Sequence, residues 1–126
     1  MDTKLDLQTE EDVRVLVHSF YFKVQQDERL NYIFSSFADV DWDEHLGTMV
    51  NFWSNILFQT GKYKGSPYRQ HVPLPIIKSD FQRWLNLFFE TVDEHFQGSN
   101  ADLVKEIAER VAVSFTSRME YEGKFN

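Results

Sequence analysis

The sequence predicts an all-α domain, and three observations support this prediction. Apolar residues recur at spacings of three and four through most of the chain, which is the period of an amphipathic helix. Residues that cap helices precede several of these stretches. No stretch alternates apolar and polar residues as a half-buried strand does. The chain has 126 residues, so we expect residues 1–126 to form a single domain.

The first predicted helix follows Thr9, because Thr9 with Asp12 three residues later resembles a capping box. This helix runs for about sixteen residues, and its apolar positions are Val13, Leu16, Val17, Phe20 and Val24. Tyr21 lies beside the apolar stripe. A short helical piece is expected next, with apolar residues at Leu30, Ile33, Phe34 and Phe37.

The third predicted helix starts at Asp41 with Glu44, and Gly61 is placed to end it. Its side chains include Trp42, His45, Leu46, Met49, Val50, Phe52, Trp53, Ile56 and Leu57. Residues 61–80 are then expected to be irregular, because they hold Gly61, Gly65 and all three prolines. An irregular stretch of this length inside a compact domain is usually functional.

Two further helices are predicted in the last third of the chain. Ser79 with Gln82 opens the first of them, and Gly98 closes it. Its apolar positions are Phe81, Trp84, Leu85, Phe88, Val92 and Phe96. Ser99 or Asn100 opens the last helix, whose apolar positions are Leu103, Val104, Ile107, Ala108, Val111, Ala112, Phe115 and Met119.

The composition excludes several classes of function. The net charge is −7 and there is no basic run, so we expect no nucleic-acid partner. Without cysteine there can be no disulfide, thiolate zinc site, iron–sulfur cluster or covalent haem attachment. The start lacks the pattern of a signal peptide, and no apolar run reaches transmembrane length. We therefore expect a cytoplasmic protein with no membrane partner, and a monomer.

His71 is the most informative residue. It lies on a short segment with glycine and proline on both sides, between two strongly aromatic helices that carry Phe52 and Phe88. A lone imidazole on a short turn with apolar walls suits the axial ligation of a haem iron. Aromatic residues make up 16% of the chain. From composition alone, they could equally line a cavity for a flat ligand or form a core rich in phenylalanine.

The other histidines give weaker signals. None has a glutamate three residues before it, so the Glu-x-x-His pairs of a di-iron bundle are absent, and no two carboxylates make a convincing acid–base pair. We expect His18 and His95 near the surface. His45 and Met49 lie one turn apart on the same helix face. Taken alone, this pair favours an ordinary packed helix, with His45 near its solvent edge, over a binding site.

Tyr21 and Trp84 carry the same ambiguity. A buried phenol or indole brings a hydrogen-bond donor that needs a partner. In an ordinary core this partner is a backbone carbonyl or water, and in a gas-binding pocket it is the bound ligand. The residues alone favour the ordinary core.

Taken together, these residues resemble the truncated haemoglobins, and group III of that family in particular. The resemblance runs from about Val13 to Phe115. The fragments that carry it are Phe20-Tyr21 with Lys23-Val24; Trp42 with His45 and then Asn51-Phe52-Trp53; Tyr63-Lys64-Gly65; His71 with Leu74-Pro75; and Phe81 with Arg83-Trp84-Leu85-Asn86-Leu87-Phe88.

The resemblance implies a two-over-two truncated globin fold enclosing a non-covalent haem b. His71 would be the proximal iron ligand, with Phe52 and Phe88 against the cofactor. The distal side would be formed by Tyr21, His45, Trp84, Met49 and Phe20. Tyr63 and Arg69 are candidates for holding the haem propionates, as the phenolic and cationic groups near His71, together with Lys62 and Tyr68. For His45, a gate and occasional donor is favoured over a permanent iron ligand.

The ligands would be O2, NO, CO or peroxide. Two donors on bound O2 would slow its release, which suits redox chemistry such as NO dioxygenation or peroxide reduction. Because no flavin or nicotinamide motif is present, an external reductase would supply electrons. The alternatives are a non-enzymatic O2 buffer or sensor and, outside the haem proteins, a haem-free helical interaction module.

Overall fold

The computed structural model describes residues 4–37, 41–63 and 76–123. These residues form helices and no strand. The elements along the chain are α1 (Glu10–Gln26), α2 (Glu28–Asn31), the π-helical η1 (Tyr32–Phe37), α3 (Trp42–Phe58), α5 (Lys78–His95) and α6 (Ser99–Tyr121). The all-α prediction is confirmed.

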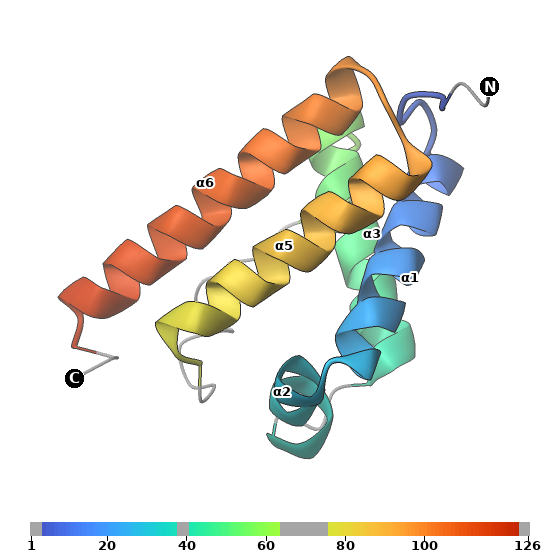
Figure 1. Cartoon of the computed structure of the whole chain (residues 1–126). Helices are drawn as coiled ribbons and strands as arrows, with labels where there is room; N and C mark the ends of the chain where they lie inside the picture. Colours follow the sequence, from blue (N-terminus) through green and yellow to red (C-terminus); the bar gives the residue numbers. More distant parts are fainter. Residues whose placement is uncertain (1–3, 38–40, 64–75, 124–126) are drawn as a thin grey trace.

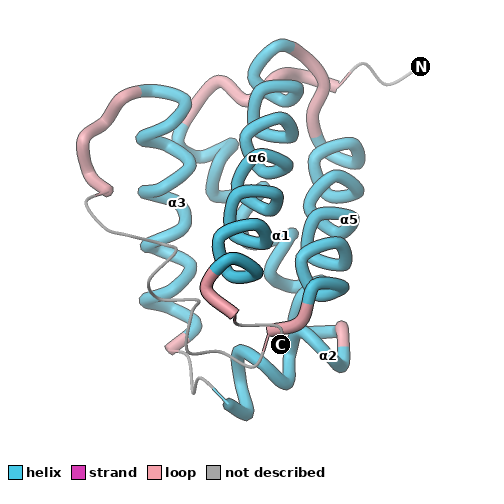
Figure 2. The backbone as a smooth tube through the Cα atoms, turned by 90° about the vertical axis from the view of Figure 1, so that its left-hand side faces the viewer, coloured by secondary structure: helices cyan, strands magenta, loops and turns pink. Residues whose placement is uncertain are grey.

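The long helices pack as two pairs (Figure 1). Helix α5 lies beside α6, and the two run in opposite directions because residues 96–98 turn the chain sharply between them (Figure 2). Helix α1 packs on α3 and also on α5, which joins the two pairs. The core lies between them and is formed by Leu16, Val17, Phe20, Val24, Val50, Trp53, Phe88, Val92, Val104 and Ala108, among others.

Two predicted helix starts are confirmed. The Asp12 N–H donates to the Thr9 hydroxyl at 3.1 Å, and the Thr9 N–H donates back to the Asp12 carboxylate at 3.1 Å. This is a complete capping box, and it fixes the start of α1. At α3, the Glu44 N–H donates to the Asp41 carboxylate at 3.2 Å. Both caps depend on residues close in sequence, which is why the pattern revealed them.

The end of α3 differs from the prediction. The helix stops at Phe58, and Gln59 takes the left-handed conformation with φ 55° and ψ 45°. Gly61 lies beyond the end, where its N–H donates to the side-chain oxygen of Asn55 at 2.8 Å. The prediction placed the left-handed residue at glycine, because glycine adopts this conformation most easily. Here glutamine adopts it instead.

The start of α5 also differs. The helix begins at Lys78, so Ser79 lies in its first turn and does not open it. The cap is provided by Asp80, whose carboxylate accepts from the Ile77 N–H at 2.9 Å. The last residues of the 61–80 stretch are therefore helical rather than irregular.

Gly98 does not close α5, which ends at His95. It directly precedes α6, with φ 147°, a conformation that favours glycine. The opening of α6 at Ser99 agrees with the prediction, but its cap comes from the other end of the chain. Both carboxylate oxygens of Asp6 accept backbone N–H groups of α6, from Asn100 at 2.9 Å and from Ala101 at 2.8 Å.

The short helical piece after α1 is confirmed as helical, although most of it is a π-helix rather than an α-helix. Leu30, Ile33 and Phe34 are buried, and all three face the cavity described below. Within the described residues, every helix is too short or too polar to cross a membrane.

Candidate functional site

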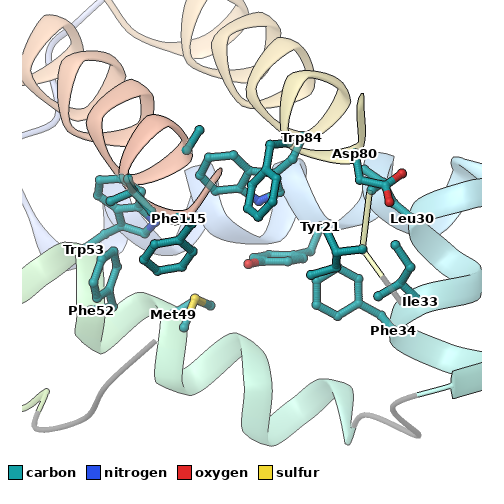
Figure 3. A pocket seen from close by; sticks show the side chains of 14 residues that line it. Tyr21, Leu30, Ile33, Phe34, Met49, Phe52, Trp53, Asp80, Trp84 and Phe115 are labelled. Carbon is teal, nitrogen blue, oxygen red and sulfur yellow. The ribbon is translucent and has the colours of Figure 1, made fainter. Parts of the chain in front are cut away.

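An apolar cavity lies between α1, η1, α3, α5 and α6 (Figure 3). Its empty volume is about 830 Å³, which includes its mouth open to solvent. Ligand pockets for small molecules and cofactors are mostly apolar too. The lining residues are Tyr21, Leu30, Ile33, Phe34, Met49, Phe52, Trp53, Ile76, Asp80, Phe81, Trp84, Val111, Ala112 and Phe115.

Tyr21 supplies the main polar group inside this cavity. Its side chain is only 5% exposed, and its hydroxyl points into the space bounded by Met49, Phe115 and Trp84 (Figure 3). The indole of Trp84 is placed to hydrogen-bond to this hydroxyl, and since an indole N–H can only donate, the Tyr21 oxygen would be the acceptor. The Tyr21 O–H therefore remains available to donate to a ligand in the cavity.

The protonation state of Tyr21 supports this role. Burial raises the pKa of Tyr21 well above its ordinary value of 10.0, because it disfavours the charged phenolate. The hydrogen bond from Trp84 lowers this pKa, but by less than burial raises it. Tyr21 is thus a neutral phenol at any physiological pH, and a neutral phenol can donate where a phenolate cannot.

His45 lies against the cavity wall rather than in it. Its ring packs edge-on against Tyr21, with centroids 4.9 Å apart, and also contacts Phe34 at 5.6 Å and Trp42 at 5.9 Å. Its Nε2 atom is buried. Met49, one turn further along α3, does line the cavity. The structure therefore brings the predicted distal residues together, with His45 next to Tyr21.

Phe20 and Phe88 lie behind the wall. Phe20 is 2% exposed and packs on Tyr21 at 4.8 Å and on Trp84 at 5.7 Å. Phe88 is 1% exposed and lies between the rings of Trp84 and Trp53. Neither phenylalanine lines the cavity. They pack against the lining rings, and their predicted contact with the ligand or the cofactor stays a prediction.

The predicted cofactor-binding residues are only partly described. Phe52 lines the cavity, and Tyr63 packs edge-on against Phe52 at 5.1 Å. Burial raises the pKa of Tyr63. The ammonium group of Lys62, a further candidate, lies 3.3 Å from the carboxylate of Glu10. Arg69, Tyr68 and His71 lie outside the described residues.

His18 and His95 are exposed, as predicted. Among residues 4–37, 41–63 and 76–123, no three His, Asp or Glu side chains gather where they could hold a metal ion.

The sequence did not reveal the ion pair at one end of the cavity. Asp80 is 4% exposed, and both its oxygens accept from the guanidinium of Arg29, at 3.1 Å from Nε and 3.1 Å from Nη2. The pair ties α2 to the start of α5, the helix that carries Trp84. The two residues are 51 positions apart, and no motif links them. Asp80 is consequently buried and paired, unlike the scattered surface carboxylates that the sequence indicated.

The sequence also did not reveal that residues of α6 line the cavity. Val111, Ala112 and Phe115 line the cavity, and Phe115 packs edge-on against Phe81 at 6.4 Å. Their helical spacing indicated only a core face. An apolar stripe looks the same in sequence whether it faces other side chains or a cavity.

The described residues fit a haem with a polar gas ligand. Aromatic and aliphatic side chains surround the cavity, as a flat apolar ring system requires. The neutral Tyr21 hydroxyl, supported by Trp84, is a donor for the ligand. The residues that flank the segment with His71 both reach this region, because Ile76 lines the cavity and Tyr63 packs on Phe52.

Comparisons with known proteins identify the family and the fold. The family model for bacterial-like globins matches residues 6–118. The group 3 truncated hemoglobin ctb of Campylobacter jejuni is 29% identical over 120 residues, which is 92% of this chain and 94% of that protein. The crystal structure of group III truncated hemoglobin from Campylobacter jejuni is similar with a TM-score of 0.83, at 29% identity and over 92% of this chain and 94% of that one.

Proposed function

This chain belongs to the bacterial-like globin family and has a truncated globin fold, and the family implies haem-based gas binding; on this basis we propose that it is a haem b protein that retains O2 tightly and carries out redox chemistry on bound O2, NO or peroxide. The observation that carries the proposal is the Tyr21 hydroxyl, a donor that burial keeps neutral in an apolar cavity beside the indole of Trp84.

In this proposal each residue has a defined role. His71 holds the haem iron, which supplies the redox chemistry when it is bound. Tyr21 donates its O–H to the gas ligand. Trp84 orients the Tyr21 hydroxyl and strengthens it as a donor, because hydrogen bonds in a chain polarise one another. The apolar walls exclude water, which would otherwise compete for the same donor.

The size of the hydrogen-bond effect favours chemistry over transport. Bound O2 carries partial negative charge, and a hydrogen bond to a charged acceptor contributes about 1.5–3 kcal/mol. Since each 1.4 kcal/mol corresponds to about tenfold, one such bond slows O2 release by about 10- to 100-fold. A protein that releases O2 so slowly is a poor carrier and suits NO dioxygenation or peroxide reduction with an external reductant.

Replacing the proximal ligand provides the test. His71→Ala should lose haem during purification, or retain a haem whose ferrous spectrum is altered and is restored by added imidazole. The matched control is His18→Ala, because His18 is exposed on α1. An unchanged ferrous spectrum in His71→Ala would end this assignment. A parent protein without a Soret band, although expressed with ample haem, would instead indicate the haem-free interaction module.

Measuring the turnover of NO or peroxide distinguishes an enzyme from a non-enzymatic O2 buffer or sensor. Catalytic consumption of NO or peroxide in the presence of a reductant supports an enzyme. Tight O2 binding without turnover of either supports an O2 buffer or sensor.

A further inference from the structure

A continuous series of aromatic rings leads from the cavity to the surface. Trp84 stacks on Phe88 at 5.6 Å with 13° between the planes, and Phe88 stacks on Trp53 at 5.0 Å with 23° between them. Trp53 contacts Phe52 edge-on at 5.1 Å, and Phe52 contacts Tyr63 edge-on at 5.1 Å. Figure 3 shows Trp84, Trp53 and Phe52 around the cavity. We call these five residues the ring series.

The burial of the ring series changes along its length. Phe88 and Trp53 are 1% and 3% exposed, so the middle is shielded from water. Tyr63 at the outer end is only partly buried, on the segment that follows α3. Both ends and the middle of the series thus hold an oxidisable side chain, since indoles and phenols give up an electron far more readily than phenylalanine does. Each phenylalanine acts only as a short bridge between them.

We propose that the ring series carries single electrons from Tyr63 to an oxidant bound in the cavity, and that Tyr63 is the site where small phenols are oxidised. This inference rests on the proposed function, because it requires hydrogen peroxide as the oxidant and the haem that would reduce it. Tyr63 is suited to the outer end because its phenolic proton can leave to water. Tyr21 is too deeply buried for this, at 5% exposed.

The reaction balances with peroxide and two phenols. Hydrogen peroxide takes up two electrons and two protons, its O–O bond breaks, and two water molecules form. Each electron leaves Tyr63 together with a phenolic proton, which is released to water, and a neutral phenoxyl radical remains on Tyr63. A small phenol outside the protein then gives one electron and one proton to Tyr63 and becomes a phenoxyl radical itself.

Electron transfer through the ring series suits only one of the proposed activities. Indoles and phenols are oxidised only by strong oxidants, so the ring series serves peroxide reduction. A low-potential flavoprotein that supplied electrons for NO dioxygenation would gain nothing from it, because those electrons would not pass through oxidised tryptophan or tyrosine. Among the activities proposed above, the ring series therefore favours the peroxidase.

Radical trapping tests the proposal without measuring turnover. The haem-loaded protein is treated with one equivalent of hydrogen peroxide and a nitroso spin trap, with no reductant, and the labelled residues are identified by peptide mass spectrometry. We expect label on Tyr63 in the parent. Tyr121 is 93% exposed on α6 and serves as an internal control for random surface oxidation. Label divided equally between Tyr63 and Tyr121 would overturn the proposal.

Two variants locate the path. Trp53→Phe keeps a ring in the middle but removes the oxidisable indole, so Tyr63 should lose most of its label. The matched control, Trp42→Phe, changes an indole outside the ring series and should leave the label on Tyr63. Tyr63→Phe should move the label inward to Trp84, which is half-buried, because Trp53 at 3% exposed is out of reach of the trap. Label on Tyr63 that survives Trp53→Phe, or label that does not move inward in Tyr63→Phe, would contradict the path.

The same samples distinguish a failure of the proposed function from a failure of the ring series alone. The Soret and ferrous-oxy spectra are recorded before peroxide is added. Without those spectra the proposed function fails, and the ring series fails with it. If both spectra are present and peroxide is consumed, but the label does not depend on Trp53, the ring series alone is wrong.

Discussion

The indole N–H of Trp84 is placed to donate to the hydroxyl oxygen of Tyr21, so these two residues act as one linked donor unit rather than two independent donors. The two side chains come from different helices, Tyr21 from α1 and Trp84 from α5. A ligand in the cavity therefore meets the Tyr21 O–H, whose orientation depends on Trp84.

Removing the Tyr21 hydroxyl should speed O2 release. Tyr21→Phe keeps the ring and its contacts with Phe20 and His45, but it removes the donor. We expect the O2 dissociation rate to rise by about 10- to 100-fold, the effect of one lost hydrogen bond to a charged acceptor. CO is less polarised when it is bound, so its dissociation should change much less. Stopped-flow kinetics measure both rates, and equal changes for O2 and CO would point to a steric effect instead.

A double-mutant cycle checks the link between the two donors. Trp84→Phe should raise the O2 dissociation rate less than Tyr21→Phe does, because the phenol remains. In the double variant, Trp84→Phe should add little to Tyr21→Phe, since coupled residues are not additive. Fully additive effects would show that Trp84 acts on the ligand directly.

His45 should not occupy the ligand position. It packs against Tyr21 beside the cavity and does not line it. In the ferrous protein without gas, both the parent and His45→Leu should therefore show a five-coordinate spectrum, while ligand association rates change in the variant. His18→Leu, an exposed change on α1, should alter neither. A six-coordinate parent that becomes five-coordinate in His45→Leu would instead make His45 an iron ligand.

Breaking the Arg29–Asp80 pair should destabilise the fold. Arg29→Gln leaves the carboxylate of Asp80 buried at 4% exposure without its cation. Exposed pairs contribute at most about 1 kcal/mol and fully buried ones about 3–5 kcal/mol when one partner is removed. Because Arg29 itself is 34% exposed, we expect a loss of about 2 kcal/mol in the free energy of unfolding.

Urea unfolding measures this loss. Arg110→Gln is the control, because Arg110 pairs with Glu106 on the surface at 74% and 55% exposure, and it should change the free energy by less than about 0.5 kcal/mol. Adding Asp80→Asn to Arg29→Gln should recover part of the loss, since no buried charge is then left unpaired. A cost in Arg29→Gln no larger than in Arg110→Gln would refute the prediction.

The cap that Asp6 provides for α6 should make stability depend on acid pH. Burial raises the pKa of Asp6, but the backbone N–H groups of Asn100 and Ala101 outweigh it and hold this pKa below its ordinary value of 3.8. A lowered pKa in the folded state means that the stabilisation is complete well above pH 3.8 and is lost as the pH falls below it.

Asp6→Asn should therefore cost about 1 kcal/mol at neutral pH, the usual contribution of such a cap. It should also weaken the acid dependence of the free energy of unfolding, measured by urea titration from pH 7 downward. Glu109→Gln, an exposed change in the middle of α6, is the control and should leave both nearly unchanged. An acid dependence in Asp6→Asn as steep as in the parent would contradict this account.

The sequence predicted the helices and the helix caps, because these features depend on residues close together in the chain. The caps at Thr9 and Asp41 involve partners three positions away, and the helices follow from apolar periodicity. The meeting of Tyr21, Met49 and Trp84 in one cavity was accessible only through the family resemblance, since a periodic stripe does not say which other stripe it faces.

The contacts between distant segments were not predictable. The chain has 20 acidic and 13 basic residues. Arg29 could pair with any of many carboxylates, so charge alone does not identify Asp80 as its partner. Asp6 reaches Asn100 across 94 positions, and no local pattern records that contact. The left-handed Gln59 was missed for a different reason, because glycine is the residue type expected there.

The contact between Asp6 and Gly98 limits how this scaffold can be diversified. A side chain added at position 98 would place its first carbon 2.5 Å from the carboxyl carbon of Asp6, at a backbone angle that other residues rarely adopt. Shortening residue 6 would relieve the collision, but it would also remove the cap of α6. A combinatorial library can therefore vary the exposed faces of the helices freely, while positions 6 and 98 are best held fixed as one inseparable unit.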